Sequence, residues 1–244
     1  MIIMAHTTCH APRSTLPSIT PSEEEYLEAI YMLGGRGNGL VKVKGLAKDL
    51  KVKDPSVVEM LQKLKERGFV GYDRSGVKLT PKGRKHAVQV VRRHQLAERL
   101  LTDVFGYRLP KVHDMACKFE HVLDDELTDR IEEMLGNPAT CPHGSIIPTP
   151  KGTLQKIEST QLTETPKGEE CLVLKIPEDR GAVERLLALN VIPGVKVKML
   201  EKLPRGAIVL LCGNTRIALS HNIASQIRVR KRHRHRRRGR GPYQ

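Results

Sequence analysis

The spacing of apolar residues changes once along the chain, and this change limits the folds open to it. Up to about residue 135, apolar side chains recur every three to four positions, as on the buried face of an α-helix. Over residues 159–230, short runs of Val, Ile and Leu alternate with Gly and Pro turns, interrupted by one helical segment at about 181–189. The chain is therefore predicted to be mainly α, with a small C-terminal β-barrel.

The first half of the helical region has the pattern of a winged helix-turn-helix. Helical segments at about 43–50 and 55–67 are separated by a tight turn, and Pro55 suits the first turn of the second helix. The stretch "FVGYDRSGVKLTP" then predicts two short strands around a hairpin tip at 74–76. A preceding helix is expected to begin at Ser22, with Glu25 three residues later completing a capping box. This pattern favours a DNA-binding domain over residues 21–90.

A long helix at 82–106 and further helical stretches within 109–135 follow, and their charge differs from that of the first domain. Residues 41–93 hold fifteen Lys and Arg against five Asp and Glu, whereas residues 114–133 hold two against eight. The basic block is typical of a polyanion-binding module and the acidic block of a cation-binding one. Residues 228–240 add nine Lys and Arg with no acid, so 231–244 is predicted to be a basic tail.

The remaining composition indicates a soluble cytoplasmic protein. Five widely spread cysteines do not form a disulfide framework, and neither a signal peptide nor a membrane span is recognisable. Residues 1–20 are predicted to be a disordered arm. Turn-forming residues at 136–152 predict a connection between domains, with the linker proper at 148–158. The Cys141-x-His143 pair in this stretch is more typical of a structural role than of a metal site.

One short stretch, "KVHDMACKFEHV", combines four potential metal ligands. On an α-helix each residue turns by roughly 100°, so Cys117, Glu120 and His121 lie at about 40°, −20° and 80° from His113. Imidazole, thiol and carboxylate groups on one face suit a divalent transition metal. On the preceding helix, the stretch "RHQLAERLLTD" places His94 and Glu98 four residues apart on one face.

These stretches resemble the diphtheria toxin repressor family of metal-dependent transcriptional regulators. The similarity covers about residues 21–147, and residues 159–230 resemble a ferrous-iron-transport-A-like barrel of the Src-homology-3 type. The resemblance implies a winged helix-turn-helix, then a helical metal-binding and dimerisation domain at 91–147, then the barrel. It also implies a homodimer with two metal sites per subunit.

The resemblance assigns the metal ligands to two sets. The ancillary set comprises His94, Glu98 and His113. The primary, activating set comprises Cys117, Glu120, His121 and, from the first helix, Glu25. The barrel stretch "PEDRGAVERL" can add Asp179 or Glu178 to the ancillary site. The thiolate of Cys117 favours Fe(II), whereas a carboxylate at Glu25 shifts the balance towards Mn(II), so Fe(II) is expected and Mn(II) stays open.

The winged helix implies contacts to double-stranded DNA, and the dimer implies a palindromic operator. Base contacts are expected from the start of the second helix, and phosphate contacts from its far end and from the wing. The candidate residues are Lys53, Pro55, Ser56, Glu59, Lys63, Arg74 and Lys78. The expected function is a repressor that uses Fe(II) as co-repressor and controls metal-uptake genes.

Other classes of protein remain open at this stage. A His/Cys/Glu site could activate water in a metalloenzyme, although the sequence shows no Gly-rich phosphate loop and no nucleophile motif. A repressor that senses a small organic effector would bind its operator without metal. A metal buffer would need no basic block. We expect neither an enzyme, nor a small organic ligand, nor a membrane partner.

Overall fold

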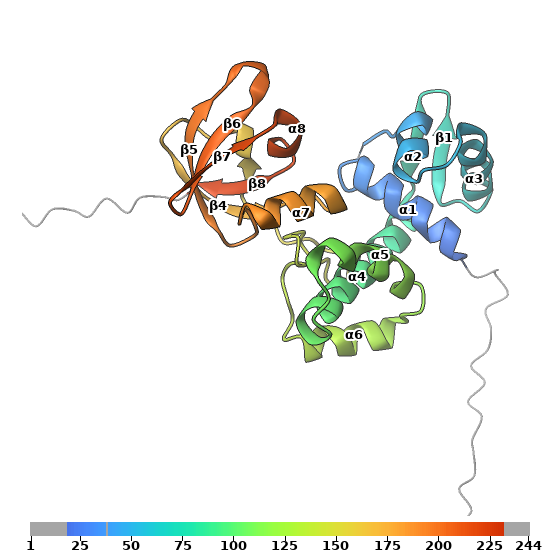
Figure 1. Ribbon diagram of the computed structural model, residues 1–244. Coiled ribbons are helices and arrows are strands. Elements are labelled where there is room, and N and C mark those ends of the chain that lie inside the picture. Colours follow the sequence, from blue (N-terminus) through green and yellow to red (C-terminus); the bar gives the residue numbers. More distant parts are fainter. Residues whose placement is uncertain (1–18, 38, 232–244) are drawn as a thin grey trace, which may run out of the picture. The chain divides into compact units, whose positions relative to one another are not determined.

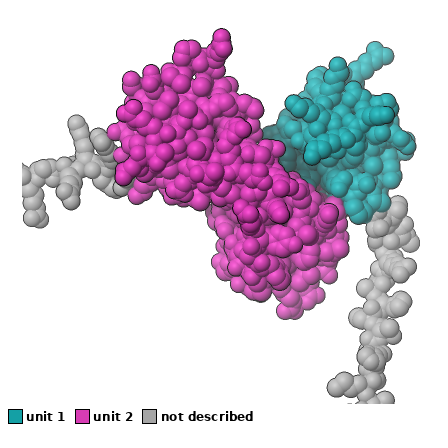
Figure 2. Space-filling model, viewed as in Figure 1, with its two compact units in different colours: residues 1–86 teal, residues 87–244 magenta. Residues whose placement is uncertain are grey.

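The computed structural model describes residues 19–37 and 39–231, so the predicted N-terminal arm up to residue 18 and the basic tail from residue 232 lie outside the described residues. The chain forms two compact units, residues 1–86 and 87–244, which are described separately (Figure 2). Within the described ranges, no helix is both long and apolar enough to span a bilayer.

The first unit is a winged helix-turn-helix, as predicted. Its helices are α1 (Pro21–Leu33), α2 (Val43–Asp49) and α3 (Asp54–Glu66), and its wing is the antiparallel hairpin β1 (Val70–Asp73) and β2 (Gly76–Leu79) (Figure 1). Side chains of all three helices, including Leu27, Leu46 and Leu61, are fully buried between them. Helical spacing in the sequence therefore identified the core-facing side of each helix.

The start of α1 differs from the expectation by two residues. Thr20, rather than Ser22, caps the helix, and the capping box is closed by Glu23 rather than Glu25. The Glu23 carboxylate is buried, and it also accepts a hydrogen bond from Arg67 at 2.5 Å and pairs with Lys63 at 3.4 Å. Glu23 therefore joins the first turn of α1 to the end of α3, which explains why Thr20 and Glu23 outcompete the alternative cap.

Helix α4 (Pro81–Arg99) begins in the first unit and continues into the second. The predicted helix at 82–106 was too long as a regular α-helix, because a π-helical turn occupies Leu100–Val104. Thr102 lies in this turn, and its hydroxyl donates to the Glu98 carbonyl at 2.9 Å and contacts the Arg99 carbonyl at 3.2 Å. Such back-bonding by Thr competes with the regular helical ladder.

The helical part of the second unit contains α5 (Leu109–Phe119) and α6 (Asp125–Met134) beside α4. Arg92 on α4 is almost fully buried and pairs with Asp129 at 2.8 Å and Glu132 at 2.5 Å on α6. A shared apolar core, including Leu96, Val112 and Ile131, packs the three helices together. These contacts hold the faces of α4 and α5 next to each other.

The C-terminal part of the second unit is a six-stranded antiparallel sheet in the order β3-β8-β4-β5-β6-β7, confirming the Src-homology-3-like β prediction. Its strands are β3 (Thr160–Gln161), β4 (Glu170–Lys175), β5 (Lys196–Lys202), β6 (Ile208–Cys212), β7 (Thr215–Leu219) and β8 (Arg228–Lys231). Two helices, α7 (Arg180–Ala188) and α8 (His221–Ala224), complete it. Side chains from the strands and from α7, such as Val183 and Leu186, form one core. Helix α7 also packs against α5.

The turn-rich stretch at 136–152 folds more tightly than its composition predicted. Cys141 donates its backbone N–H to the Ser145 carbonyl at 2.8 Å, and Ile176 donates to the His143 carbonyl at 2.9 Å. Gly144 has a φ of 88°, and a Cβ there would lie 1.8 Å from the Leu174 carbonyl oxygen. The turn around Cys141 and His143 thus packs closely against β4.

Candidate metal centre

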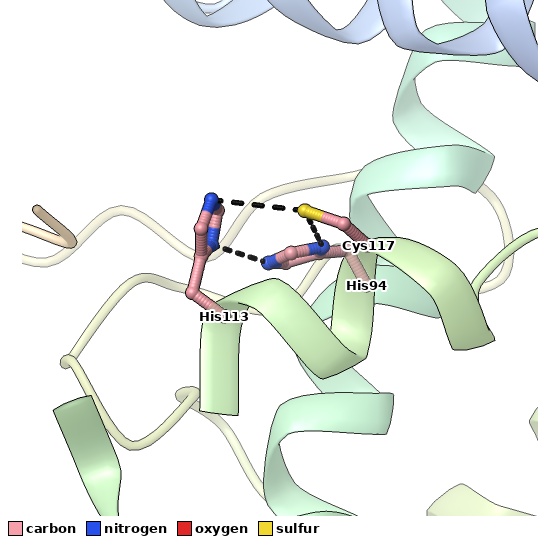
Figure 3. A group of neighbouring side chains, drawn as sticks. All are labelled: His94, His113 and Cys117. Carbon is pink, nitrogen blue, oxygen red and sulfur yellow. Dashed lines mark hydrogen bonds between the residues drawn. The ribbon is translucent and has the colours of Figure 1, made fainter. Parts of the chain in front are cut away.

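The first group of potential ligands, named here the first cluster, comprises His94, His113, Cys117 and Glu120. His94 comes from α4, and His113 and Cys117 come from successive turns of α5. The Cys117 sulfur lies 3.9 Å from His94 Nδ1 and 3.7 Å from His113 Nε2, and the two imidazoles approach to 3.1 Å (Figure 3). Three of the side chains predicted to bind metal therefore converge on one point between two helices.

Glu120 completes this cluster from just beyond the end of α5. Its carboxylate lies 2.5 Å from His94 Nδ1, and His121 Nε2 lies 3.5 Å from its other oxygen. The sequence predicted a helix through His121, but α5 ends at Phe119 and Glu120 is its C-cap. Glu120 still donates its backbone N–H to the Ala116 carbonyl at 2.9 Å, so the helical spacing extends to its side chain.

A second cluster comprises Glu98, Cys141 and His143, whose ligand atoms all lie within 4.8 Å of one another. All three side chains are buried. His143 Nδ1 lies 3.2 Å from one oxygen of Glu98 and 3.3 Å from the other. The sequence interpretation treated Cys141 and His143 as a structural pair in a connection, and it missed their meeting with Glu98. The only sequence signal was the Cys-x-His spacing, which does not reveal a partner over 40 residues away.

Glu98 connects the two clusters. Its carboxylate lies 3.3 Å from His94 Nε2 and 3.7 Å from His113 Nδ1, in addition to its contacts with His143. The predicted ancillary set of His94, Glu98 and His113 is therefore a set of neighbours. Within this set, His94 and His113 also lie beside Cys117, and Glu98 also lies beside Cys141 and His143. The division of ligands between two metal sites stays a prediction.

Electrostatics favour a thiolate in the first cluster. Burial raises the pKa of Cys117, but hydrogen bonds from His113 and His94 outweigh burial and lower the pKa to about 7. The same contact with Cys117, together with Glu98, raises the pKa of His113 to about 10. At neutral pH the metal-free first cluster thus contains an imidazolium beside a thiol that is about half ionised. A metal cation that binds the thiolate would displace the remaining proton.

The thiol pKa in the second cluster is shifted in the opposite direction. Burial, followed by the negative charges of Glu98 and Glu178, raises the pKa of Cys141 well above its usual value. Glu98 is also buried, which raises its pKa, but hydrogen bonds from His113, His143 and His94 outweigh this effect and hold the pKa well below the usual range. Glu98 therefore stays ionised while Cys141 stays protonated in the metal-free protein.

The barrel contributes Glu178 rather than Asp179 to the surroundings of the second cluster. Ser145 donates its hydroxyl to Glu178 at 2.8 Å, and the charges of Glu98 and His143 both act on the pKa of Glu178. The Asp179 side chain instead caps α7, accepting the backbone N–H of Ala182 at 2.8 Å. Asp179 as a metal ligand stays a prediction, and its carboxylate already has a structural role.

The residues present fit a divalent transition metal. In the second cluster, His143 Nε2 is buried and has no hydrogen-bond partner among the described residues. Buried polar atoms rarely remain unsatisfied, so this nitrogen is consistent with a metal ion that accepts its lone pair. Imidazole, thiolate and carboxylate groups in both clusters form a donor set typical of iron, zinc, cobalt or manganese.

Two predicted metal ligands remain, and one of them belongs to the first unit. Glu25 lies on the exposed side of α1, opposite the buried Tyr26 and Leu27. His121 is largely buried and adjoins Glu120, as noted above. The assignment of Glu25 and His121 as ligands stays a prediction.

The predicted DNA-binding residues are all exposed in the first unit. Helix α3 buries Val57, Leu61 and Leu64 and exposes the opposite side, and the wing exposes its tip. The exposed candidates are Lys53, Pro55, Ser56, Glu59, Lys63, Arg74 and Lys78. The wing tip is fixed by Asp73, which accepts from the Ser75 backbone at 2.7 Å, and by Lys42, which donates to the Ser75 carbonyl at 2.5 Å. Individual roles in DNA binding stay predictions.

Comparison with known families accounts for each of these regions. Residues 18–76 match the iron-dependent repressor N-terminal DNA-binding domain, and residues 80–149 match the iron-dependent repressor metal-binding and dimerisation domain. Residues 160–231 match the FeoA domain. The chain belongs to the iron-dependent repressor family, a family of metal-dependent DNA-binding transcriptional regulators. The resemblance stated from the sequence is confirmed.

Individual relatives span nearly the whole chain. The iron-dependent repressor IdeR of Mycobacterium leprae (strain TN) is 30% identical over 226 residues, covering 86% of this chain and 97% of its own. The diphtheria toxin repressor of Corynebacterium glutamicum is 32% identical over 219 residues, a match that covers 86% of this chain and 92% of the relative. The solved structure of a manganese-dependent transcriptional repressor in complex with manganese has a TM-score of 0.80 at 29% identity. The match covers 86% of this chain and 99% of that chain.

Proposed function

We propose that this protein is a homodimeric repressor whose binding to a palindromic operator is switched on by Fe(II), and that it controls genes of metal uptake. The observation that carries the proposal is the first cluster, in which His94, His113, Cys117 and Glu120 meet between α4 and α5. Membership of the iron-dependent repressor family supports DNA binding, dimerisation and metal dependence.

The choice of Fe(II) rests on the thiol of Cys117. A sulfur ligand with a pKa of about 7 favours softer ions over Mn(II), which prefers oxygen and imidazole ligands. Mn(II) is the alternative, because Glu25 would add a hard carboxylate and because a structural relative is a manganese-dependent repressor. We propose two sites per subunit, with Glu25, Cys117, Glu120 and His121 as the activating site and His94, Glu98 and His113 as the ancillary site. Cys141 and His143, which adjoin Glu98, are proposed as further ligands of the ancillary site.

The proposed switch depends on helix α4, which is shared by both units. The helix starts at Pro81, directly after the wing, and carries His94 and Glu98 near its other end. A divalent ion, when bound, supplies positive charge that holds the thiolate and carboxylates of the cluster together. His94 on α4 and His113 and Cys117 on α5 then keep one relative arrangement, and this arrangement favours the DNA-binding state.

Contacts to DNA would come from α3 and the wing. Ser56 and Glu59 lie on the exposed side of the first two turns of α3, where a recognition helix reads base edges, and Glu59 can accept from a cytosine amino group. Arg74 and Lys78 on the wing would contact phosphates. Lys63 is exposed but forms an ion pair with Glu23, so we expect it to contribute less to phosphate binding than Arg74.

Two other functions would use the same clusters. A metalloenzyme would turn over a substrate at the first cluster, and a metal buffer would bind the ion without any effect on DNA. We propose neither, because the metal ligands belong to a chain with a complete winged helix-turn-helix and because the family consists of transcriptional regulators.

The test is DNA binding by the full chain after its metal has been removed. Fluorescence anisotropy with DNA from upstream of its own gene would be measured with anaerobic Fe(II), Mn(II), Zn(II) and Mg(II) in turn. We expect Fe(II) to raise the affinity by about tenfold or more, at a lower concentration than Mn(II) requires. Mg(II), which prefers oxygen ligands, is the control for general cation effects.

Equal affinity with and without metal would contradict the proposed switch and favour a regulator of another kind. Stronger activation by Mn(II) than by Fe(II) would keep the switch and replace the proposed ion.

A further inference from the structure

We propose that Glu23, through its ion pair with Arg67, links the metal-binding helix α1 to the recognition helix α3 and so sets how strongly metal changes DNA binding. Glu23 is a positioning residue, because it acts through its neighbours rather than on the ion or the DNA itself. The inference rests on the proposed function, in which Glu25 on α1 helps to hold the activating ion.

The Glu23 carboxylate joins two helices of the first unit, α1 and α3 (Figure 1). Its side chain is 0% exposed. Glu23 Oε2 accepts the Thr20 backbone N–H at 2.8 Å, at the start of α1, and the Arg67 Nη1 at 2.5 Å, at the end of α3. Glu23 Oε1 lies 3.4 Å from Lys63 Nζ, one turn earlier on α3. One buried carboxylate therefore connects the first turn of α1 to the last turn of α3.

Arg67 is itself held in place by other parts of the first unit. It is the C-cap of α3, and its side chain is 21% exposed. Its guanidinium carbon lies 5.3 Å from the centre of the Phe69 ring, just before the wing. Lys82, in the first turn of α4, donates to the Arg67 carbonyl at 2.9 Å. Glu23 therefore has a fixed partner at the point where α3, the wing and the start of α4 meet.

The pair supplies a direction that the core between these helices does not. The core is apolar and includes Leu27 of α1 and Leu61 of α3. Apolar contacts are non-directional, whereas a charge-assisted hydrogen bond depends on both distance and angle. The Glu23–Arg67 pair therefore fixes the position of the first turn of α1 relative to the end of α3.

The position of Glu23 suits a link between metal and DNA. Glu25 follows it by two residues on the same helix. An ion that holds Glu25 restrains the first turns of α1, and the pair with Arg67 passes this restraint to α3. The exposed side of α3 carries the candidate base contacts Ser56 and Glu59. Without Arg67, the ion still restrains α1, but the arrangement of α3 depends on it less.

The alternative is that Glu23 serves only to start α1. Thr20 and Glu23 form a complete capping box, which by itself stabilises the first turn. The two roles use different partners, because the cap requires Thr20 and the link requires Arg67. Substitutions of the two partners therefore separate the roles, while Glu23 stays in place in both variants.

The test measures one ratio, the DNA affinity of the full chain with saturating metal divided by its affinity without metal. Anisotropy on the upstream duplex would be measured with anaerobic Fe(II) and with Mn(II). We expect Arg67→Gln to lower the ratio by about fivefold or more, and Thr20→Ala to leave it within about twofold of the wild-type value. By linkage, DNA should raise the metal affinity of Arg67→Gln by the same reduced factor.

Two further variants complete the design. Lys65→Gln is the matched control, because it removes a cation from the same helix that donates to the Tyr72 carbonyl on the wing at 3.0 Å. Its ratio should stay within about twofold of the wild-type value. Arg67→Lys keeps the charge and loses the guanidinium geometry, so its ratio should lie between those of wild type and Arg67→Gln.

The outcomes separate this link from the proposed switch. Equal losses of DNA affinity with and without metal in Arg67→Gln would overturn the link, because a purely structural role leaves the ratio unchanged. A lowered ratio in Thr20→Ala with an unchanged ratio in Arg67→Gln would also overturn it, in favour of the cap. A wild-type ratio of one would contradict the proposed switch, and this link with it.

Discussion

The two clusters use the same kinds of ligand in different surroundings. In the first, Cys117 is partly exposed and two histidines lower its thiol pKa to about 7. In the second, Cys141 is buried, and burial together with nearby carboxylates raises its pKa. A partly exposed thiolate can exchange a metal with solvent, whereas a buried thiol must first lose its proton. From this difference we expect that the first cluster senses the metal and that the second holds α4 against the turn at 141–145.

Glu98 belongs to both clusters, and its substitution is expected to change the stability of the protein more than any other proposed below. Glu98→Gln removes the buried charge that accepts hydrogen bonds from His94, His113 and His143, so we expect the metal-free protein to lose about 3 kcal/mol of unfolding free energy. Urea denaturation in the presence of a chelator would measure it. Glu126→Gln, which breaks an exposed pair with Arg130, is the control and should cost less than about 1 kcal/mol.

The same substitution changes the pH dependence of stability. Because the pKa of Glu98 is lowered in the folded protein, its stabilising contribution is present above about pH 4.5 and is lost as the pH falls through the lower folded value. Wild-type protein should therefore lose more stability than Glu98→Gln when the pH drops from 5 to 3. Parallel acid profiles for the two proteins would contradict this account of Glu98.

We expect Cys117 and Cys141 to differ strongly in their rates of alkylation. In metal-free protein at pH 7.5, we expect iodoacetamide to modify Cys117 about a hundredfold faster than Cys141, because only the thiolate reacts and only Cys117 is accessible. The rate at Cys117 should fall as the pH decreases below about 7. Peptide mass spectrometry would resolve the sites, with the buried Cys171 as an internal reference. Comparable rates at Cys117 and Cys141 would contradict the proposed difference in thiol ionisation and accessibility between the two clusters.

Of the two carboxylates near α7, Glu178 and Asp179, we expect only Glu178 to affect metal binding at the second cluster. Glu178→Gln removes a negative charge that acts on Cys141 and Glu98, so we expect about tenfold weaker Co(II) binding at the second cluster, followed by its thiolate-to-cobalt absorption. The spectrum is read in the Cys117→Ala background, which leaves Cys141 as the thiol of the two clusters. An unchanged titration would exclude Glu178 from this site.

Asp179→Ala gives the smallest change. It removes the N-cap of α7, so the expected loss is about 1 kcal/mol of unfolding free energy with Co(II) binding unchanged. Thermal or urea denaturation would measure the stability. Weakened metal binding in this variant, without weakening in Glu178→Gln, would reverse the roles of the two residues and restore Asp179 as the ligand.

Local patterns in the sequence identified most of the elements and the residues of the first cluster, but not the grouping of His94 and His113 with Cys117 and Glu120. The spacing of apolar residues identified α1 to α6 and the wing, and the interval from His113 to Glu120 placed ligands on one side of α5. The sequence pattern did not reveal the second cluster, because a meeting of Glu98 with Cys141 and His143 depends on how the turn at 141–145 packs. The π-helical turn after Arg99 was missed for a similar reason, since it depends on hydroxyl bonding by Thr102.

We propose that the first cluster switches DNA binding while the second supports the fold. The most direct test is DNA anisotropy with saturating anaerobic Fe(II) for wild type, Cys117→Ala and Cys141→Ala, on the same upstream duplex. We predict that Cys117→Ala binds DNA as weakly as the metal-free wild type, and that Cys141→Ala keeps most of the metal-induced affinity. Full activation of Cys117→Ala by Fe(II), with loss of activation in Cys141→Ala, would contradict the claim and make the buried cluster the sensor.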